Sequence, residues 1–299
     1  MANMKARSRA GKRGSVSFGH ALIMFLLTVW FLLIIFPFWN AIMLSFMSQG
    51  EGTRHPAALI PYGFTLDNYR NLVERGGLGL AYRNTVLITV LGTAYGMLIS
   101  TMMAYAFSQK FPGKRFFLIM MIFTMYFGGG VVPMYLLIKS LGLINKLGCI
   151  ILMGGVSSFN VIIMKNSFEN TPQALGEAAK IDGANDIRIF FQIMLPLQAP
   201  LLATFSLFTA VGYWNEWFWS TLVLNKQGLQ PLMVYLRSIV NTIDEETTHF
   251  SSAMTTRANV FPMGTRMCAV VMTMLPIMCV YPFLQRYFVK GITIGSVKM

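Results

Sequence analysis

The sequence predicts an all-α protein that crosses a membrane six times. Of its 299 residues, 55% are hydrophobic and only 12% are charged, whereas soluble domains carry about 25% charged residues. Six apolar stretches are each long enough for a helix to cross the ~30 Å hydrocarbon layer. Strands are not expected, because an open sheet edge cannot satisfy its backbone groups in hydrocarbon.

The first three predicted spans are residues 21–46, 84–107 and 116–138. The first follows a basic N-terminus, residues 1–20, and superficially resembles a secretory signal peptide. Its apolar run is too long for one and no small-residue cleavage site follows, so an uncleaved helix is predicted. The second span contains Gly92 and Gly96, a G-x-x-x-G spacing that weakly predicts a helix-packing face.

The last three predicted spans are residues 147–164, 197–222 and 264–288, and residues 289–299 form a C-terminal tail. The membrane domain therefore extends over residues 21–288. The fourth span contains small and polar residues, which suit a helix that faces other helices rather than lipid. These residues are Gly154, Gly155, Ser157, Ser158 and Asn160.

Basic residues predict the orientation. With a cytosolic N-terminus, the inner segments hold 14 of the 24 Lys and Arg residues although the outer segments are longer. This agrees with the excess of basic residues in cytoplasmic loops. Both termini and the loop at 165–196 are then cytosolic. The net charge of +13 is therefore attributed to topology and membrane lipid, and no nucleic-acid partner is expected.

No catalytic chemistry is predicted for the chain. Cys149, Cys268 and Cys279 are scattered among apolar segments, a pattern that gives neither a disulfide framework nor metal-ligand spacing. The sequence contains no G-x-x-x-x-G-K-[ST] nucleotide-binding loop and no nucleophile–base pair. We therefore expect no catalytic residue, no metal site and no cofactor bound by this chain.

The cytosolic loop contains a predicted helical hairpin, residues 171–196. Thr171 and Pro172 predict a helix start, with a hydroxyl cap and proline at the first helical position. Gly183 predicts the end of that helix. Asn185 or Asp186 caps a second short helix, which Pro196 closes. The residue types alone also suit an ordinary amphipathic linker at the membrane surface.

The hairpin carries a recognisable motif. Glu177-Ala178-Ala179, then Gly183, then Ile193-x-Leu195-Pro196 match every defined position of EAA-x3-G-x9-IxLP. This motif resembles the signature of the membrane subunits of bacterial ABC importers. The layout of six spans, Asn84, the pair Trp214-Asn215 and residues 285–291 are similar to MalG-type carbohydrate permeases. Residues 125–143 resemble a subgroup that imports oligosaccharides or polysaccharides.

The resemblance implies a type I ABC importer permease whose hairpin is the cytosolic coupling helix, seated in a groove of an ATPase. It implies that Glu177 pairs with a basic residue of that ATPase, beside Asp182. It also implies that Ala178, Ala179 and Gly183 permit close packing.

The implied partners are a second permease subunit in a heterodimer, two cytosolic ATPase subunits that use ATP and Mg²⁺, and an external or periplasmic solute-binding protein. The implied location is the bacterial inner membrane, and the implied mechanism is alternating access.

Two groups of outer residues are further candidates. The first would line a sugar path, because aromatic rings stack on sugars while Asn and Glu bond hydroxyls; an interfacial aromatic belt is the alternative. This group is Tyr213, Trp214, Asn215, Glu216 and Trp217. The second, in the loop at 223–263, would contact the binding protein; a solvated loop is the alternative. It comprises Asp244, Glu245, Glu246 and His249.

The remaining outer loop, residues 47–83, is expected to hold one short helix at about 66–73. The C-terminal tail is expected either to contact the ATPases or to bind anionic lipid.

The substrate is left open. Outer segments carry ten basic and seven acidic residues, which is compatible with an acidic polymer such as alginate and also with neutral oligosaccharides. A permease of the same architecture for a non-sugar solute such as a peptide is one alternative. An ion-coupled secondary transporter is another, although the spans contain almost no acidic residues for ion coupling.

Overall fold

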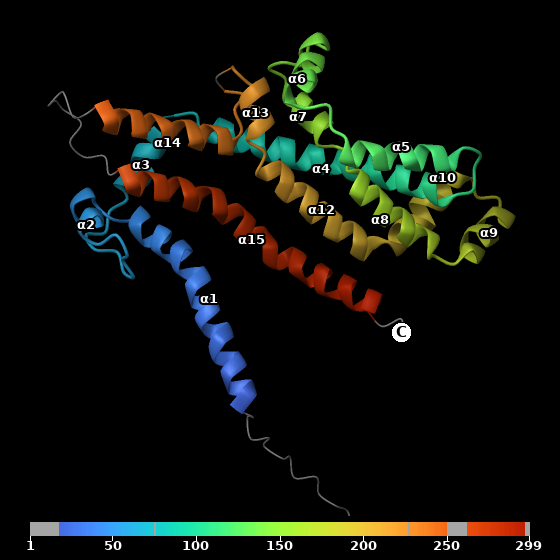
Figure 1. The fold of residues 1–299 in the computed structure, drawn as a ribbon, viewed down its shortest axis with the longest axis horizontal. Coiled ribbons are helices and arrows are strands. Elements are labelled where there is room, and N and C mark those ends of the chain that lie inside the picture. The colour runs from blue at the N-terminus through green and yellow to red at the C-terminus, as the bar shows by residue number, and fades with distance from the viewer. Residues whose placement is uncertain (1–17, 75, 227, 250–261, 297–299) are drawn as a thin grey trace, which may run out of the picture.

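The computed structural model of the chain is almost entirely helical (Figure 1). It describes residues 18–74, 76–226, 228–249 and 262–296. Within these ranges the β pairing is limited to one isolated bridge, between Met47 and Phe64. The predicted all-α class is confirmed.

The six-span layout is present, but half of the spans are interrupted. Three helices are long and apolar enough to cross a membrane by themselves: α1 (Phe18–Ser45), α4 (Leu78–Ser108) and the part of α15 (Pro262–Ser296) from Met263 to Val280. Counting each of three bent helix pairs as one span brings the number to six.

The third span is broken. Its halves, α5 (Lys114–Tyr126) and α6 (Val131–Ser140), meet at 113°. The prediction of a continuous helix over 116–138 was therefore wrong. The junction contains Gly128, Gly129 and Gly130, and Gly130 has φ +87°. Glycine has low helix propensity and is the residue that adopts positive φ without steric cost.

The fourth span is broken as well, so a continuous helix over 147–164 was also wrong. Its halves, α7 (Leu147–Met153) and α8 (Ser158–Glu169), are bent by 51°. Gly154 follows the end of α7. The Ser157 hydroxyl accepts the backbone N–H of Asn160 at 3.4 Å and so caps the new helix.

The fifth span is divided into α12 (Ala199–Trp214) and α13 (Phe218–Val223), so the single helix expected over 197–222 was wrong. The segment before it, Asp186–Leu197, lies at 84° to α12. It therefore crosses the end of α12 instead of extending it.

The connecting loops contain more helix than expected. The loop at 47–83 holds α2 (Gln49–Arg54) in addition to the predicted short helix, α3 (Asp67–Glu74). The loop at 223–263 contains α14 (Leu232–His249). Its Leu232, Leu236 and Ile239 are buried at helical spacing, a signal that would have predicted it. α15 continues to Ser296, so most of the predicted tail is helical.

α4 is the centre of the packing and contacts α7, α8, α12 and α14. Two of its glycines permit this. A side chain at Gly92 would come within 2.5 Å of the Tyr213 ring, and one at Gly96 would collide with the carbonyl oxygen of Gly155. The predicted G-x-x-x-G packing face is confirmed. It brings the interruptions of the fourth and fifth spans together on one side of α4.

Candidate functional site

The turn of the hairpin is built around Gly183. The first arm, α9 (Gln173–Ile181), ends at Asp182, and Gly183 then adopts φ +81°. The N–H of Ala184 donates to the carbonyl of Ala179 at 2.9 Å, and that of Gly183 to Lys180 at 3.0 Å. This pair of bonds is the Schellman motif, which favours glycine at this position. Gly183 ends the helix as predicted.

The second arm begins as predicted and ends later than predicted. The Asn185 side chain accepts the N–H of Arg188 at 2.8 Å and caps α10 (Asp186–Ile189). A π-helical turn (Phe190–Met194) and α11 (Leu195–Leu197) follow without a break. Pro196 does not itself end this helix, which continues one residue further, to Leu197.

The start of the first arm also differs. Pro172 is the residue before the helix rather than its first residue, and it makes no side-chain cap. The Thr171 hydroxyl donates to the Ser167 carbonyl at 3.2 Å instead of capping α9. The prediction that the Thr171 hydroxyl caps the first arm was therefore wrong.

The two alanines of the motif face different ways. Ala179 is buried inside the hairpin in a cluster with Ile189, Phe190 and Met194. Ala178 is exposed. Ala179 therefore allows the two arms of the hairpin to approach each other, and Ala178 is the alanine left on the outer surface. Ile193 and Leu195 are half-buried against the same cluster, while Asp182 and Pro196 are exposed.

The outer surface of the hairpin combines exposed apolar side chains with two acids, Glu177 and Asp182, that form no ion pair with a described residue. Ile181 is 86% exposed and Ile187 68% exposed. Glu177 is exposed and forms no ion pair with any described residue. Across the turn, Lys180 donates to Asp186 at 3.0 Å, and this hydrogen bond raises the pKa of Lys180. Exposed apolar side chains in a polar loop are typical of a protein-contact surface.

The base of the hairpin is closed by Gln198. Its side chain is buried and lies between α8 and α12. Its carbonyl oxygen accepts the Ser167 hydroxyl at 2.6 Å, and its amide donates to the Thr171 hydroxyl at 3.0 Å. Buried polar groups bonded in this way hold their elements in one arrangement. We call these three residues the Gln198 brace.

A second contact holds α8 to α5. Glu169, the last residue of α8, forms ion pairs with Lys114 at 2.8 Å and with Lys165 at 2.6 Å. All three side chains are at least partly shielded from solvent. The hairpin therefore leaves the membrane domain from a fixed base.

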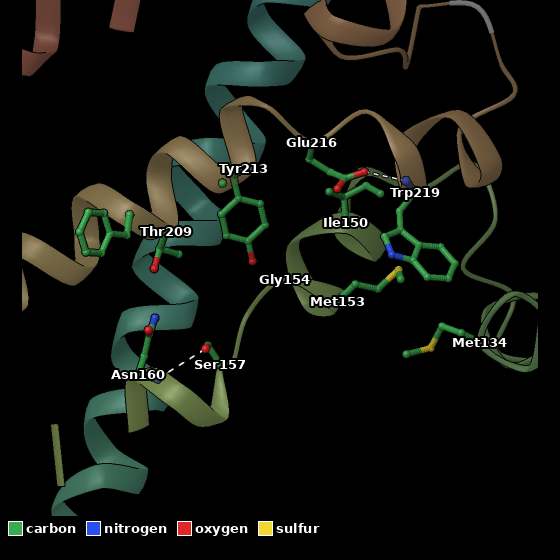
Figure 2. A pocket seen from close by; sticks show the side chains of 12 residues that line it. Met134, Ile150, Met153, Gly154, Ser157, Asn160, Thr209, Tyr213, Glu216 and Trp219 are labelled. Atoms are coloured by element: carbon green, nitrogen blue, oxygen red, sulfur yellow. Dashed lines mark hydrogen bonds between the residues drawn. The ribbon is translucent and has the colours of Figure 1, made fainter. Parts of the chain in front are cut away.

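A cavity of about 440 Å³ lies at the ends of α8 and α12 that are opposite to the hairpin. Both helix interruptions line it (Figure 2). Its polar lining residues are Ser157, Asn160, Thr209, Tyr213, Glu216 and Trp219. Methionines, Phe208 and Ile150 supply apolar lining. Among the described residues, no group of three or more His, Cys, Asp or Glu side chains is placed to hold a metal ion.

Comparison with known proteins identifies the family. The family model described as "Binding-protein-dependent transport system inner membrane component" matches residues 96–294, which include the hairpin and the cavity. The chain belongs to this family. The family's members are transport permeases, so the chain is a membrane transport permease.

Named relatives of this permease support the same placement. It is 39% identical over 287 residues to the Polygalacturonan/rhamnogalacturonan transport system permease protein YtcP of Bacillus subtilis (strain 168), covering 93% of this chain and 97% of that one. It is 31% identical over 291 residues to the Arabinooligosaccharides transport system permease protein AraQ of Halalkalibacterium halodurans, covering 93% and 97%.

A solved structure shares the whole fold of this permease. It is the crystal structure of a bacterial ABC transporter involved in the import of the acidic polysaccharide alginate. One of its chains superposes with a TM-score of 0.82 at 28% identity, covering 96% of this chain and 100% of that chain. The type I importer permease fold implied by the motif is confirmed.

Of the five residues predicted for the sugar path, Tyr213 and Glu216 line the cavity. The Tyr213 hydroxyl donates to the carbonyl of Ile151 at 2.7 Å, and the residue is only 6% exposed at the cavity wall. One oxygen of Glu216 accepts the N–H groups of Trp219 at 2.6 Å and Ser220 at 3.2 Å. Glu216 therefore caps α13.

The other three predicted residues lie outside the cavity lining. The Trp214 indole donates to Thr273 of α15 at 3.3 Å. Asn215 ends α12. Arg237 lies over the Trp217 ring at 3.9 Å from its centroid. Trp214 thus contacts α15 and Trp217 contacts α14.

The loop residues predicted to contact a binding protein fall in the last turns of α14. The backbone places Asp244, Glu245, Glu246 and His249 there, so the flexible loop expected from residue 241 onward was wrong up to His249. Residues 250–261 lie outside the described ranges.

Cavity residues that the prediction missed are Asn160, Thr209 and Trp219. A polar residue in an apolar span was the available signal, since Asn160 had been noted only as a helix-packing residue.

Proposed function

We propose that this chain is one membrane-spanning half of an ATP-driven importer that takes up oligosaccharide or polysaccharide from an external binding protein. The named relatives and the structural relative support a carbohydrate substrate, and none of those reported above supports a peptide or an ion-coupled transporter.

The observation that carries this proposal is the outer surface of the hairpin. It presents Glu177, which forms no ion pair with a described residue, together with the exposed Ile181 and Ile187, on a turn fixed by Gly183 and on a base fixed by the Gln198 brace. A rigid surface with exposed apolar side chains and an acidic anchor suits a groove of an ATPase that carries a basic residue. Rigid-body movement of the ATPase then moves α8 and α12 together.

In the proposed cycle, a loaded binding protein docks on the outer loops. ATP and Mg²⁺ close two ATPase subunits in the cytosol. This chain performs no chemistry in that step. The ATPases draw its hairpin toward that of a second, different permease. The translocation pathway between the two permeases then opens outward. Hydrolysis resets the pair. Both termini of this chain and the hairpin lie in the cytosol of a bacterial inner membrane.

The test is Glu177→Arg in the assembled transporter, which consists of both permeases, the ATPases and the binding protein. We expect transport and sugar-stimulated ATP hydrolysis to be abolished, because the anchor charge is reversed while no internal contact is lost. Glu177→Gln, which removes only the charge, should reduce coupling by roughly tenfold, the value of a charge-assisted hydrogen bond. Membrane insertion serves as the control. Normal uptake by Glu177→Arg would contradict the proposal.

A further inference from the structure

The cavity at the helix interruptions has the features of a ligand site. Its volume of about 440 Å³ lies within the ~300–1,000 Å³ typical of small-molecule sites. Non-helical backbone at membrane depth occurs where it is buried in protein or lines a cavity. Here two interruptions, at 154–157 and 215–217, meet at the same cavity. In transporters, broken helices of this kind mark binding sites.

Two polar side chains in the cavity have hydrogen-bonding capacity to spare. The Asn160 amide comes from α8 and the Thr209 hydroxyl from α12, and neither side chain bonds to any described residue. Figure 2 shows their polar ends pointing toward one another. The second oxygen of Glu216 likewise receives no donor from the described part of the chain. Three groups from three places on the cavity wall are thus available to a ligand.

The rest of the wall suits a sugar ring. Tyr213 is fixed in the wall by its bond to Ile151 and by packing against Gly92 and Gly154, so its buried ring shapes the cavity and the half-buried Trp219 supplies the stacking face. The indole of Trp219 lies on the other side of the cavity (Figure 2). Fixed aromatic faces stack on the C–H faces of sugars, while amide, hydroxyl and carboxylate groups bond the hydroxyls.

The charge of the wall decides which sugar fits. Glu216 is the only charged residue among the described residues that line the cavity; no Lys, Arg or His lines it. A uronic acid ring would bring a second carboxylate close to the half-buried Glu216, with no cation in the described cavity lining to offset the repulsion.

We propose that this cavity binds one neutral sugar ring of the transported chain, held by Asn160, Thr209 and Glu216 and stacked on the indole of Trp219, and that it discriminates against uronic acids. The inference rests on the proposed function, since it identifies which unit of the carbohydrate this half of the pathway contacts. A polymer that contains acidic units must place a neutral unit here, or leave its carboxylates to the partner permease.

The first experiment measures binding directly. The assembled transporter in nanodiscs is titrated with methyl galactoside and methyl glucoside and with the corresponding methyl uronides, which differ only at C6. Tryptophan fluorescence is followed, and Trp219→Phe identifies the signal of the cavity. We expect a neutral glycoside to bind at least about tenfold more tightly than its uronide. Glu216→Gln keeps the oxygen that caps α13 and removes the charge. In this variant the neutral glycoside and its uronide should bind with nearly equal affinity.

The second experiment removes the free polar groups. Thr209→Val and Asn160→Leu keep side-chain size, and each should weaken binding of the neutral glycoside by about fivefold, the value of one hydrogen bond. The matched control is Thr204→Val on the same helix, whose hydroxyl donates to Pro200 outside the cavity lining. It should bind as the unchanged protein does.

The outcomes separate the two proposals. Equal or tighter binding of uronides by the unchanged protein overturns the inference, as does wild-type binding by both Thr209→Val and Asn160→Leu. Absence of any glycoside binding while oligosaccharide uptake proceeds also overturns it and leaves the proposed function intact. If no oligosaccharide-loaded binding protein drives uptake, the proposed function itself fails.

Discussion

At the scale of single residues, glycines determine where the helices of this permease meet. Gly92 admits the Tyr213 ring and Gly96 admits the backbone of Gly155, one turn of α4 apart. The sequence spacing indicated a packing face, but it did not identify the partners, because these lie more than 50 residues away in the chain. Gly183 differs in this respect, because its role in the turn could be predicted from its neighbours in sequence alone.

Replacing Gly96 tests the packing face. Gly96→Ala places a methyl group against the Gly155 carbonyl, so we expect a loss of stability of about 1–3 kcal/mol, as for other overpacked sites. Gly79→Ala on the same helix is the matched control, because nothing lies within 4 Å of a side chain there. It should be neutral or slightly stabilising. Thermal unfolding of the purified complex measures both, and equal midpoints would refute the prediction.

Substitutions of Gly183 can distinguish its role in the turn from its role in contact with the ATPase. Asn and Asp tolerate its left-handed conformation, and nothing in the chain lies within 4 Å of an added side chain. Gly183→Asn and Gly183→Asp should therefore insert and fold. We expect both to abolish transport, because their side chains occupy the space that the ATPase needs. Full uptake by both variants would show that Gly183 serves only the turn.

At the scale of helices, the Gln198 brace joins the end of α8 to the start of α12 across the base of the hairpin. Gln198→Leu removes the hydrogen bonds between the buried Gln198 side chain and the half-buried hydroxyls of Ser167 and Thr171, which costs about 1–3 kcal/mol. We expect the hairpin to loosen at its base. The number of sugars imported per ATP hydrolysed should then fall severalfold while ATP hydrolysis continues.

The control for the brace is Gln109→Leu. Gln109 is exposed after the end of α4 and bonds only Ser108, its neighbour in sequence. It should keep the wild-type ratio of sugar to ATP. A Gln198→Leu transporter with that same ratio would show that the brace stabilises the fold without transmitting movement.

The helices also show what the sequence could and could not predict. Hydropathy located the spans, since lipid selects for apolar residues along a whole helix. It did not locate the interruptions at 127–130, 154–157 and 215–217, because hydropathy averages over a window and the flanking residues are strongly apolar. The glycines at 128–130 and 154–155 and the polar pair at 215–216 were local signals of a break. α14 was missed although Leu232, Leu236 and Ile239 follow helical spacing. In the hairpin, the turn was predictable, whereas the inward position of Ala179 depends on how the arms pack.

At the scale of the whole molecule, α8 and α12 each carry the hairpin at one end and the cavity at the other. Each is 12–16 residues long, so the two sites are roughly 20 Å apart along the helices. Movement of the hairpin therefore displaces Asn160 on α8 and Thr209 on α12 together. This gives one structural route from ATP to the sugar.

The outer end of α14 is predicted to receive the binding protein. Deleting residues 244–252 should abolish the stimulation of ATP hydrolysis by that protein while basal hydrolysis persists, because the buried anchors Leu232, Leu236 and Ile239 remain. A variant with Asp244→Asn, Glu245→Gln and Glu246→Gln removes the acidic charges and keeps the length of the segment. It therefore shows whether the charges or the segment itself make the contact. Retained stimulation in the deletion would reject this contact.

The arrangement of the first and last helices has a consequence for how the protein is made. α1 is buried only in its last turns, at Ala41, Leu44 and Ser45, and α15 is its main packing partner. More than 200 residues separate the end of α1 from the start of α15. At about 5–20 residues per second, a ribosome takes roughly 10–40 s to cover that distance. Throughout that interval α1 must stand in the bilayer without its partner, and a chain that stops before α15 leaves a stable anchor with no transporter attached.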